Sequence, residues 1–195
     1  MSARTKPNLD GGCNPSLIIV DVDGSGFNLT DAAHGVRFDI FGDGTPVQVA
    51  WTAKGSTNAF LVLDKNNSGS IESGVELFGN ITPQAASSAP NGFLALAEFD
   101  KPENGGNGDG VIDARDAIFL KLRLWQDINH NGISEPNELH TLTELGVYSI
   151  SLNFHFSNRV DAFGNQFEFR AKVADQANKD GARWAWDIFF TWLNP

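Results

Sequence analysis

Apolar residues divide the chain into three parts with different spacing. Short apolar runs predict β-strands at 17–20, 36–41, 47–52 and 60–63, separated by glycine-containing turns. Farther along, apolar residues recur every three or four positions, which predicts short helices at 93–99 and 114–125 and another that begins at Glu138. After residue 149 the spacing becomes two, which predicts antiparallel strands. They cover 150–156, 167–173 and 184–192.

Four segments place an oxygen-bearing side chain at every second position and then a glycine. They begin near Asp21, Asp64, Asn107 and Asp127. Oxygens at positions 1, 3 and 5 of a tight loop converge on one point, and a main-chain carbonyl at 7 and a carboxylate near 12 complete the ligand set that Ca²⁺ prefers. A single segment of this kind is explained by turn formation alone, because Asp, Asn and Gly favour turns. Several such segments, each followed by an acid at the right distance, predict calcium binding instead.

The loop from Asp127, called here the third loop (127–138), fits this spacing best. Glu138 falls at position 12, and the leucines after it predict a helix. The first loop (64–76) has Val75 at position 12, so its closing acid comes one residue late. The predicted ligands of the third loop are Asp127, Asn129, Asn131, Ile133 and Glu138, and those of the first are Asp64, Asn66, Ser68, Ser70, Glu72 and Glu76.

The second loop (100–116) is irregular at its start. Counting back from an acid at position 12 puts Gly105 at position 1, where it offers no side-chain ligand. Asp100 replaces it if residues 101–106 bulge outward. The predicted ligands are therefore Asp100, Asn107, Asp109, Val111, Asp113 and Asp116.

The segment with Asp21, Asp23 and Ser25 offers a possible fourth calcium site, but position 12 is Ala32 and carries no carboxylate. It follows an apolar strand, so turn chemistry is a rival interpretation. A hairpin turn also explains Asp39 and Asp43.

Charge and composition narrow the function classes. Twenty-four acidic and 14 basic residues among 195 give a net charge of −10, which disfavours nucleic acid as a partner. Cys13 is the only cysteine, so neither an internal disulfide nor a thiolate zinc site can form. No apolar run is long enough to span a membrane, and no signal peptide is visible. Scattered histidines and the lack of nucleophile motifs favour a non-enzymatic protein.

Several motifs together resemble the EF-hand-like calcium module of exported bacterial RTX-type proteins, including the self-processing module of iron-regulated RTX proteins. The resemblance covers about residues 15–152. The motifs are Ile19-Val-Asp-Val-Asp-Gly24, Val75-Glu-Leu-Phe-Gly79, Leu94-Ala-Leu-Ala-Glu98, Leu122-Arg-Leu-Trp-Gln-Asp127, Asn131-Gly-Ile-Ser134, Asn137-Glu-Leu-His-Thr-Leu142 and Glu144-Leu-Gly146.

The resemblance implies calcium binding and a secreted location. In that module calcium triggers cleavage of an Asp-Pro bond before the first strand, whereas this chain has Asn14-Pro15. An amide cannot form the anhydride that an aspartate forms, so the resemblance transfers the fold and calcium binding but not the protease activity. Cleavage at Asn14-Pro15 through the amide nitrogen stays an alternative.

We therefore expect an α+β fold, with EF-hand-like calcium loops and short helices flanked by N-terminal β-hairpins and a C-terminal antiparallel sheet. A disordered lead is expected at 1–14, followed by one domain at 15–195 with β-structure at 15–63, loops and helices at 64–146, and β-structure at 147–195. The expected function is a calcium-stabilised module with about three Ca²⁺ sites. An adhesion or carbohydrate-binding role for the aromatic stripe of Trp184, Trp186 and Trp192 is a further alternative, although core packing is favoured.

Overall fold

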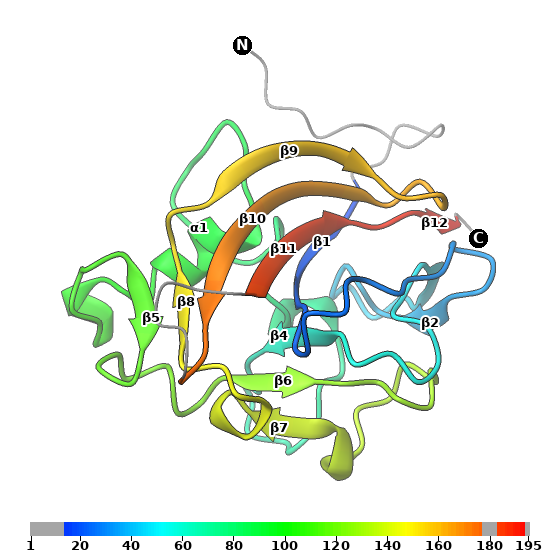
Figure 1. Cartoon of the computed structure of the whole chain (residues 1–195). Helices are drawn as coiled ribbons and strands as arrows, with labels where there is room; N and C mark the ends of the chain where they lie inside the picture. The colour runs from blue at the N-terminus through cyan, green and yellow to red at the C-terminus, as the bar shows by residue number, and fades with distance from the viewer. Residues whose placement is uncertain (1–13, 177–182, 194–195) are drawn as a thin grey trace.

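A strongly curved sheet of nine strands forms the framework, with a smaller sheet of three strands at one end (Figure 1). This computed structural model describes residues 14–176 and 183–193. The large sheet has the order β5-β8-β10-β11-β1-β4-β6-β7, with β9 also paired to β10, and the small one has the order β12-β3-β2. The strands are β1 (Ser16–Val20), β2 (Val36–Phe38), β3 (Val47–Val49), β4 (Ala59–Val62), β5 (Val111–Asp113), β6 (Arg123–Trp125), β7 (Leu139–Thr141), β8 (Ser149–Ser151), β9 (His155–Val160), β10 (Gln166–Ala174), β11 (Arg183–Phe189) and β12 (Trp192–Leu193).

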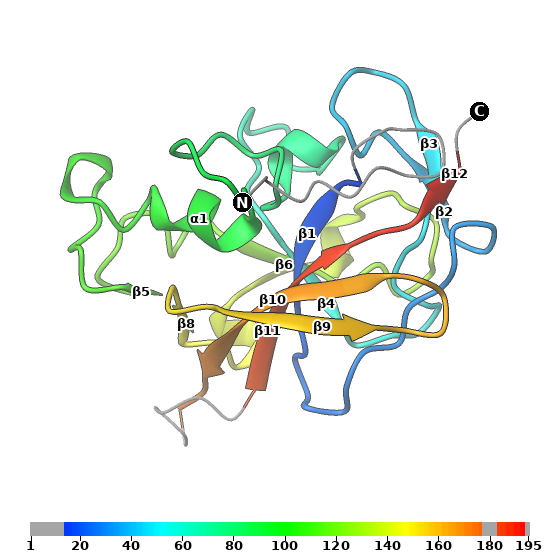
Figure 2. The same cartoon turned by 90° about the horizontal axis from the view of Figure 1, so that it is seen from above.

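Strand β1 lies in the middle of the large sheet and is buried on both faces. Polar residues do not alternate with apolar ones along β1, because each face of the strand packs on a separate core. Ile18 and Val20 face the core that includes Phe93. Leu17 and Ile19 face the other core. Strand β11 pairs with β1, and the two lie beside each other in the view from above (Figure 2).

The α-helix α1 (Gly92–Ala97) lies on one face of the sheet (Figure 2). Asn91 caps it, since its side-chain oxygen accepts hydrogen bonds from the main-chain N–H groups of Phe93 and Leu94. The apolar face of α1 is buried in the first core. The helix predicted at 93–99 is therefore confirmed, although it is shorter.

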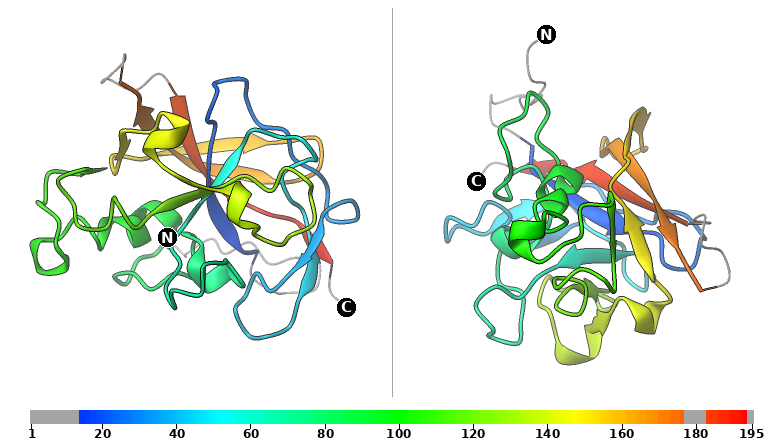
Figure 3. Two further views of the ribbon diagram at one scale, coloured as in Figure 1. Left: turned by 90° about the horizontal axis from the view of Figure 1, so that it is seen from below. Right: turned by 90° about the vertical axis from the view of Figure 1, so that its left-hand side faces the viewer.

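The predicted α+β fold is wrong, because the fold is mostly β-structure and α1 is the sole α-helix among the described residues. The helix predicted at 114–125 is replaced by turns and by β6, which pairs with β4 and β7. The helix predicted after Glu138 is replaced by β7 and by short 3₁₀ turns at Pro136–Glu138 and Thr143–Leu145. Sheet pairing satisfies the main chain here, so leucines spaced for a helix lie on a strand and a turn. Figure 3 shows this yellow-green part of the ribbon from two further sides.

Strands occur at most of the predicted positions, but two predictions need correction. The strand predicted at 150–156 is divided between β8 and β9, and the one at 184–192 is divided between β11 and β12. The grouping of the strands also differs. β2 and β3 form an antiparallel hairpin, whereas β1 and β4 join the large sheet. The expected C-terminal sheet is part of that same sheet, because β11 pairs with both β10 and β1. Of the predicted lead, residues 1–13 lie outside the described residues. Asn14 is described, and it is buried.

Candidate calcium loops

The first loop is closed by two carboxylates that bind main-chain amides. Asp64 accepts hydrogen bonds from the N–H groups of Ser68 at 3.1 Å and Gly69 at 2.8 Å. Glu76 accepts them from Lys65 at 3.2 Å and Glu72 at 2.9 Å. These bonds orient one acid from each end of the loop.

Side-chain oxygens converge on Glu72 within this loop. The Ser68 and Ser70 hydroxyls donate to one of its carboxylate oxygens at 2.5 and 2.6 Å, and the Asn66 amide donates to the other at 3.2 Å. The structure thus brings together the side chains at positions 3, 5, 7 and 9. Positive φ angles at Asn67 (56°) and Gly69 (86°) turn the main chain around them.

The third loop repeats the same bonds. Asp127 accepts from the N–H groups of Asn131 at 3.0 Å and Gly132 at 2.8 Å, and Glu138 accepts from Ile128 at 3.0 Å. Both acids are buried, at 1% and 2% exposure, and the side chain of Ile133 points to solvent.

Two buried tryptophans also hold the third loop. The indole N–H of Trp51 donates to Asp127 at 2.9 Å, and that of Trp125 donates to Glu138 at 3.4 Å. The two rings contact each other edge to face in the second core. The first and last acids of this loop are thereby joined to the interior.

Glu135 is a candidate ligand that the sequence reasoning missed. It occupies position 9 of the third loop, as Glu72 does in the first, and the amides of Asn129 and Asn131 donate to it at 3.3 and 2.8 Å. Counting nine positions from Asp127 was enough to find it.

The second loop has the expected bulge, with Asp100 at its head. Asp100 accepts from the N–H groups of Gly108 at 3.0 Å and Gly110 at 2.9 Å. Asp116 accepts from Asn107 at 3.2 Å and Asp113 at 2.8 Å. The main chain at Gly106 approaches Asp100 so closely that a Cβ there would lie 2.2 Å from its carbonyl carbon. This contact lets 101–106 loop out without moving Asp100 away.

Carboxyl groups in the first and third loops are paired in a way that favours a bound cation. Burial raises the pKa of Glu76 and of Glu138. The pKa of the partner acid in each loop shifts the opposite way. The hydroxyls of Ser68 and Ser70 lower the pKa of Glu72 to about 2. The Asn131 amide, and after it the contact with Glu138, lower the pKa of Glu135. A divalent cation between the two carboxylates of each pair would remove their like-charge repulsion.

In the second loop an arginine neutralises the acids. The Arg115 guanidinium lies 2.6 Å from Asp109 and 2.6 Å from Asp113. Contact with Arg115 lowers the pKa of Asp113. Acidic side chains therefore gather in all three loops, and in the second loop Arg115 already provides a positive counterpart.

The first and third loops are hydrogen-bonded to each other at position 8. The N–H group of Ile71 donates to the Ser134 hydroxyl at 2.6 Å, and both residues are buried. A change of geometry in one loop is transmitted directly to the other.

The segment at Asp21 has the turn but lacks a closing acid. Asp21 accepts from the Gly26 N–H group at 3.1 Å, and Asp23 accepts from Ser25 at 2.9 Å. The Thr57 hydroxyl donates to the other oxygen of Asp23. Asp31, the nearest downstream acid, instead binds His34. The segment from Asp21 to Gly26 therefore has the geometry of an Asx turn.

In 14–176 and 183–193, no three His, Cys, Asp or Glu side chains form a group placed to hold a metal ion. The predicted ligand sets also use amide, hydroxyl and main-chain oxygens, which such a group does not include. Calcium binding therefore rests on the loop geometry.

The aromatic stripe belongs largely to the interior. Trp186 is buried, and Trp184 and Trp192 are half-buried against the second core. The guanidinium of Arg170 covers the Trp184 ring at 4.5 Å, and the Lys172 ammonium lies 4.0 Å from it. These contacts support packing as the role of the stripe.

The residues at the start of β1 form a separate polar cluster. The Asn80 side-chain amide donates to the main-chain carbonyl of Asn14 at 3.1 Å, and the Asn80 oxygen accepts from the Ser16 N–H group at 2.9 Å. The side-chain oxygen of Asn14 is buried and has no hydrogen-bond partner among the described residues. Asn80 follows four residues after Glu76, the closing acid of the first loop.

Comparison with known proteins agrees with this arrangement of motifs. The SPM domain matches residues 18–191. The chain belongs to the SPM domain family. Iron-regulated protein FrpA of Neisseria meningitidis serogroup C is 40% identical over 151 residues, which is 76% of this chain and 13% of the relative. The chain thus spans about one-eighth of the length of that relative. The predicted relation to iron-regulated RTX-type proteins is confirmed at the level of the family.

A search of the described helices finds none with the length and apolar character needed to cross a membrane.

Proposed function

We propose that this chain is a calcium-binding and calcium-stabilised module of an exported bacterial protein. The observation that carries the proposal is the set of three buried acids, Glu76, Asp116 and Glu138, which main-chain amides turn toward their loops. Asp64, Asp100 and Asp127 oppose them from the other end of each loop. Carboxylate, amide and carbonyl oxygens in this arrangement suit the six to eight ligands of Ca²⁺.

Calcium would supply folding free energy that disulfides cannot provide in a chain with one cysteine. If free calcium were ~100 times the dissociation constant, each independent site would add about 2.7 kcal/mol. Extracellular calcium modules work with dissociation constants of roughly 10⁻⁴–10⁻³ M. The resemblance to exported RTX-type proteins and the relation to FrpA support an extracellular location.

Calorimetric calcium titration and thermal unfolding of chelated protein test this proposal. We expect about three bound ions and a large rise in melting temperature when calcium is added. Glu138→Gln should remove one ion, and Ser87→Ala, on an exposed connecting loop, should remove none. An unchanged melting temperature and no heat of binding would refute the proposal.

A second candidate function is self-cleavage at Asn14-Pro15. The Asn80 amide is placed to polarise the Asn14 carbonyl, and ordering of the first loop would position Asn80 four residues after Glu76. Attack by the Asn14 side-chain nitrogen on its own carbonyl carbon would form a succinimide and break the bond to Pro15. The proton lost from the attacking amide would pass to the Pro15 nitrogen.

Intact mass spectrometry of chelated protein before and after calcium addition tests this second function. Cleavage predicts loss of residues 1–14, and both Asn80→Ala and Asn14→Gln should prevent it. An intact mass after prolonged incubation, with calcium shown to be bound, would refute self-cleavage and leave the binding proposal standing.

A further inference from the structure

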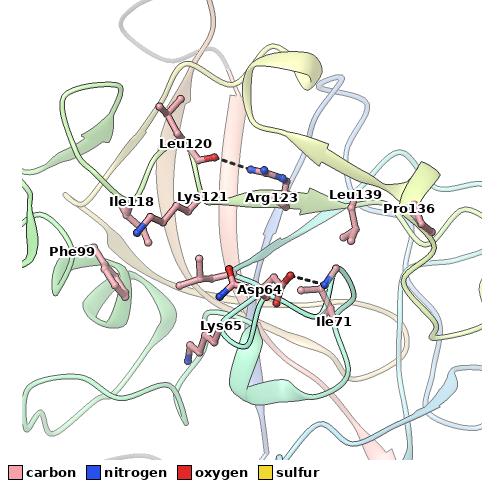
Figure 4. Close-up of a pocket in the computed structure, with 13 residues that line it drawn as sticks. Asp64, Lys65, Ile71, Phe99, Ile118, Leu120, Lys121, Arg123, Pro136 and Leu139 are labelled. Carbon is pink, nitrogen blue, oxygen red and sulfur yellow. Dashed lines mark hydrogen bonds between the residues drawn. The ribbon is translucent and has the colours of Figure 1, made fainter.

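A hollow with apolar walls lies beside the first loop. It has a volume of about 780 Å³, within the range of small-molecule sites. Phe99 and Ile118 lie on one side, and Ile71 and Leu139 lie on the other (Figure 4). Leu120 lines it as well and is 77% exposed, which is unusual for a large apolar side chain.

Three cations from two segments also line this hollow: Lys65 from the first loop, and Lys121 and Arg123 from the segment that leads into β6 (Figure 4). They represent three of the 14 basic residues of an acidic protein. No described carboxylate forms an ion pair with any of them. The Lys65 ammonium donates to the Val75 carbonyl. Arg123 donates to the carbonyls of Leu120 and Leu122, both at 2.8 Å.

Lys121 is the least engaged of the three. It is exposed, and none of its charged hydrogens is bound to a described residue. Asp64 lines the hollow too, but its oxygens accept the amides of Ser68 and Gly69, so it belongs to the loop. The hollow thus presents apolar walls together with the ammonium of Lys121, which is unpaired among the described residues. Lys65 interacts electrostatically with Glu76, and Arg123 with Glu144, although neither forms an ion pair with a described acid.

We propose that this hollow is a binding site for a small organic anion with an apolar body and a carboxylate head group. The apolar body would remove Phe99, Ile118 and Leu120 from water. The carboxylate would pair first with Lys121, which has no acidic partner among the described residues, and then with Arg123, whose interaction with Glu144 is electrostatic and not an ion pair. Arginine and lysine side chains that already lie against apolar walls lose little hydration when such a ligand binds.

Binding at this site would be linked to the first loop. Asp64, Asn67 and Gly69 belong to that loop and line the hollow. If calcium fixes these residues, it fixes that wall, and a second ligand then needs less ordering to bind. The proposal nevertheless stands apart from the calcium proposal, because the cations and the apolar walls exist independently of the bound ion.

Isothermal calorimetry with phenylbutyrate, phenylbutanol and phenylbutylamine tests the proposal in saturating calcium. These probes share one apolar body and differ in head-group charge. We expect phenylbutyrate to bind at least about tenfold more tightly than the alcohol, a difference of about 1.4 kcal/mol. Amide NMR shifts of residues 120–123 should accompany binding.

The variant Lys121→Glu makes the test specific. It should reverse the order of affinity, so that the amine binds more tightly than the carboxylate. The matched control Lys172→Glu changes an exposed lysine on β10 and should keep the original order. Equal affinity for acid and alcohol, an unchanged order in Lys121→Glu, or no binding of any probe would overturn the proposal. Calcium affinity measured on the same samples separates such a failure from a failure of the calcium proposal.

Discussion

The indole nitrogen of Trp51 donates a hydrogen bond to Asp127, 76 residues later, at 2.9 Å. Trp51 is fully buried, and its ring packs on Phe60 and Trp125. The first acid of the third loop is therefore oriented by the second core. Any ion that binds this acid lies close to an indole, which provides a direct optical signal.

Terbium, which binds the same oxygen ligands as calcium, should luminesce in the third loop when tryptophan is excited. Glu138→Gln should remove most of that luminescence, because it alters the acid contacted by Trp125. Glu76→Gln should retain most of it, since no described tryptophan donates to the acids of the first loop. Equal losses in the two variants would contradict the assignment of the signal to the third loop.

Trp51→Phe preserves an aromatic ring but removes the donor. We expect it to lower the free energy of unfolding by about 1.5–3 kcal/mol, the usual contribution of a hydrogen bond to a charged group. Chemical denaturation measures this change. Calcium affinity of the third loop should fall with it, whereas that of the second loop should not.

Asp187 predicts an unusual dependence of stability on pH. It is fully buried on β11, and desolvation raises its pKa from 3.8 to about 7, although it accepts a hydrogen bond from the Gly92 N–H group. The folded state thus binds a proton that the unfolded state releases. The stability that comes from keeping Asp187 protonated is fully present below pH 3.8, where both states hold the proton. It is lost as the pH rises from 3.8 toward about 7.

Asp187→Asn should therefore be more stable than the parent at pH 8, by up to about 4 kcal/mol, and should match it near pH 3.5. Denaturation at several pH values in chelator gives the difference between the two proteins. Asp43→Asn, at an exposed turn, is the control. A constant difference across this range would show that Asp187 does not gain a proton on folding.

Arg115 should compete with any calcium ion that binds in the second loop. Its guanidinium is 61% exposed and pairs with Asp109 and Asp113, so its removal costs little stability. Arg115→Gln should tighten calcium binding at this loop by about fivefold, or roughly 1 kcal/mol. Calorimetry in the Glu76→Gln, Glu138→Gln background isolates the site. Weaker binding would mean instead that Arg115 holds the acids in position; Arg37→Gln is the control.

Ser134 couples the first and third loops through its hydrogen bond to Ile71. Ser134→Ala leaves a buried N–H group without a partner and should cost about 1–3 kcal/mol. It should also reduce the cooperativity of calcium binding, as seen in the steepness of the titration curve. An unchanged slope would show that the two loops bind independently.

The loops could be predicted from the sequence, while the sheet that supports them could not. Oxygen and glycine spacing located Asp100 across a six-residue bulge, because loop geometry depends on neighbours in the chain. The helix proposed at 114–125 failed because β4, far away in sequence, pairs with Arg123–Trp125. The contact between Trp51 and Asp127 could not be predicted from the sequence for the same reason. Side-chain periodicity carries no information about a partner strand 60 residues away.

The position of β1 between β4 and β11 has a consequence for how the protein folds. Ser16–Val20 precedes every other described strand in the sequence, yet one of its two neighbours is β11. Until Arg183–Phe189 pairs with it, one edge of this apolar strand stays open, and edges of this kind recruit other chains. The centre of the large sheet therefore closes only when β11 arrives, after which the short strands β5 and β7 are its outer members.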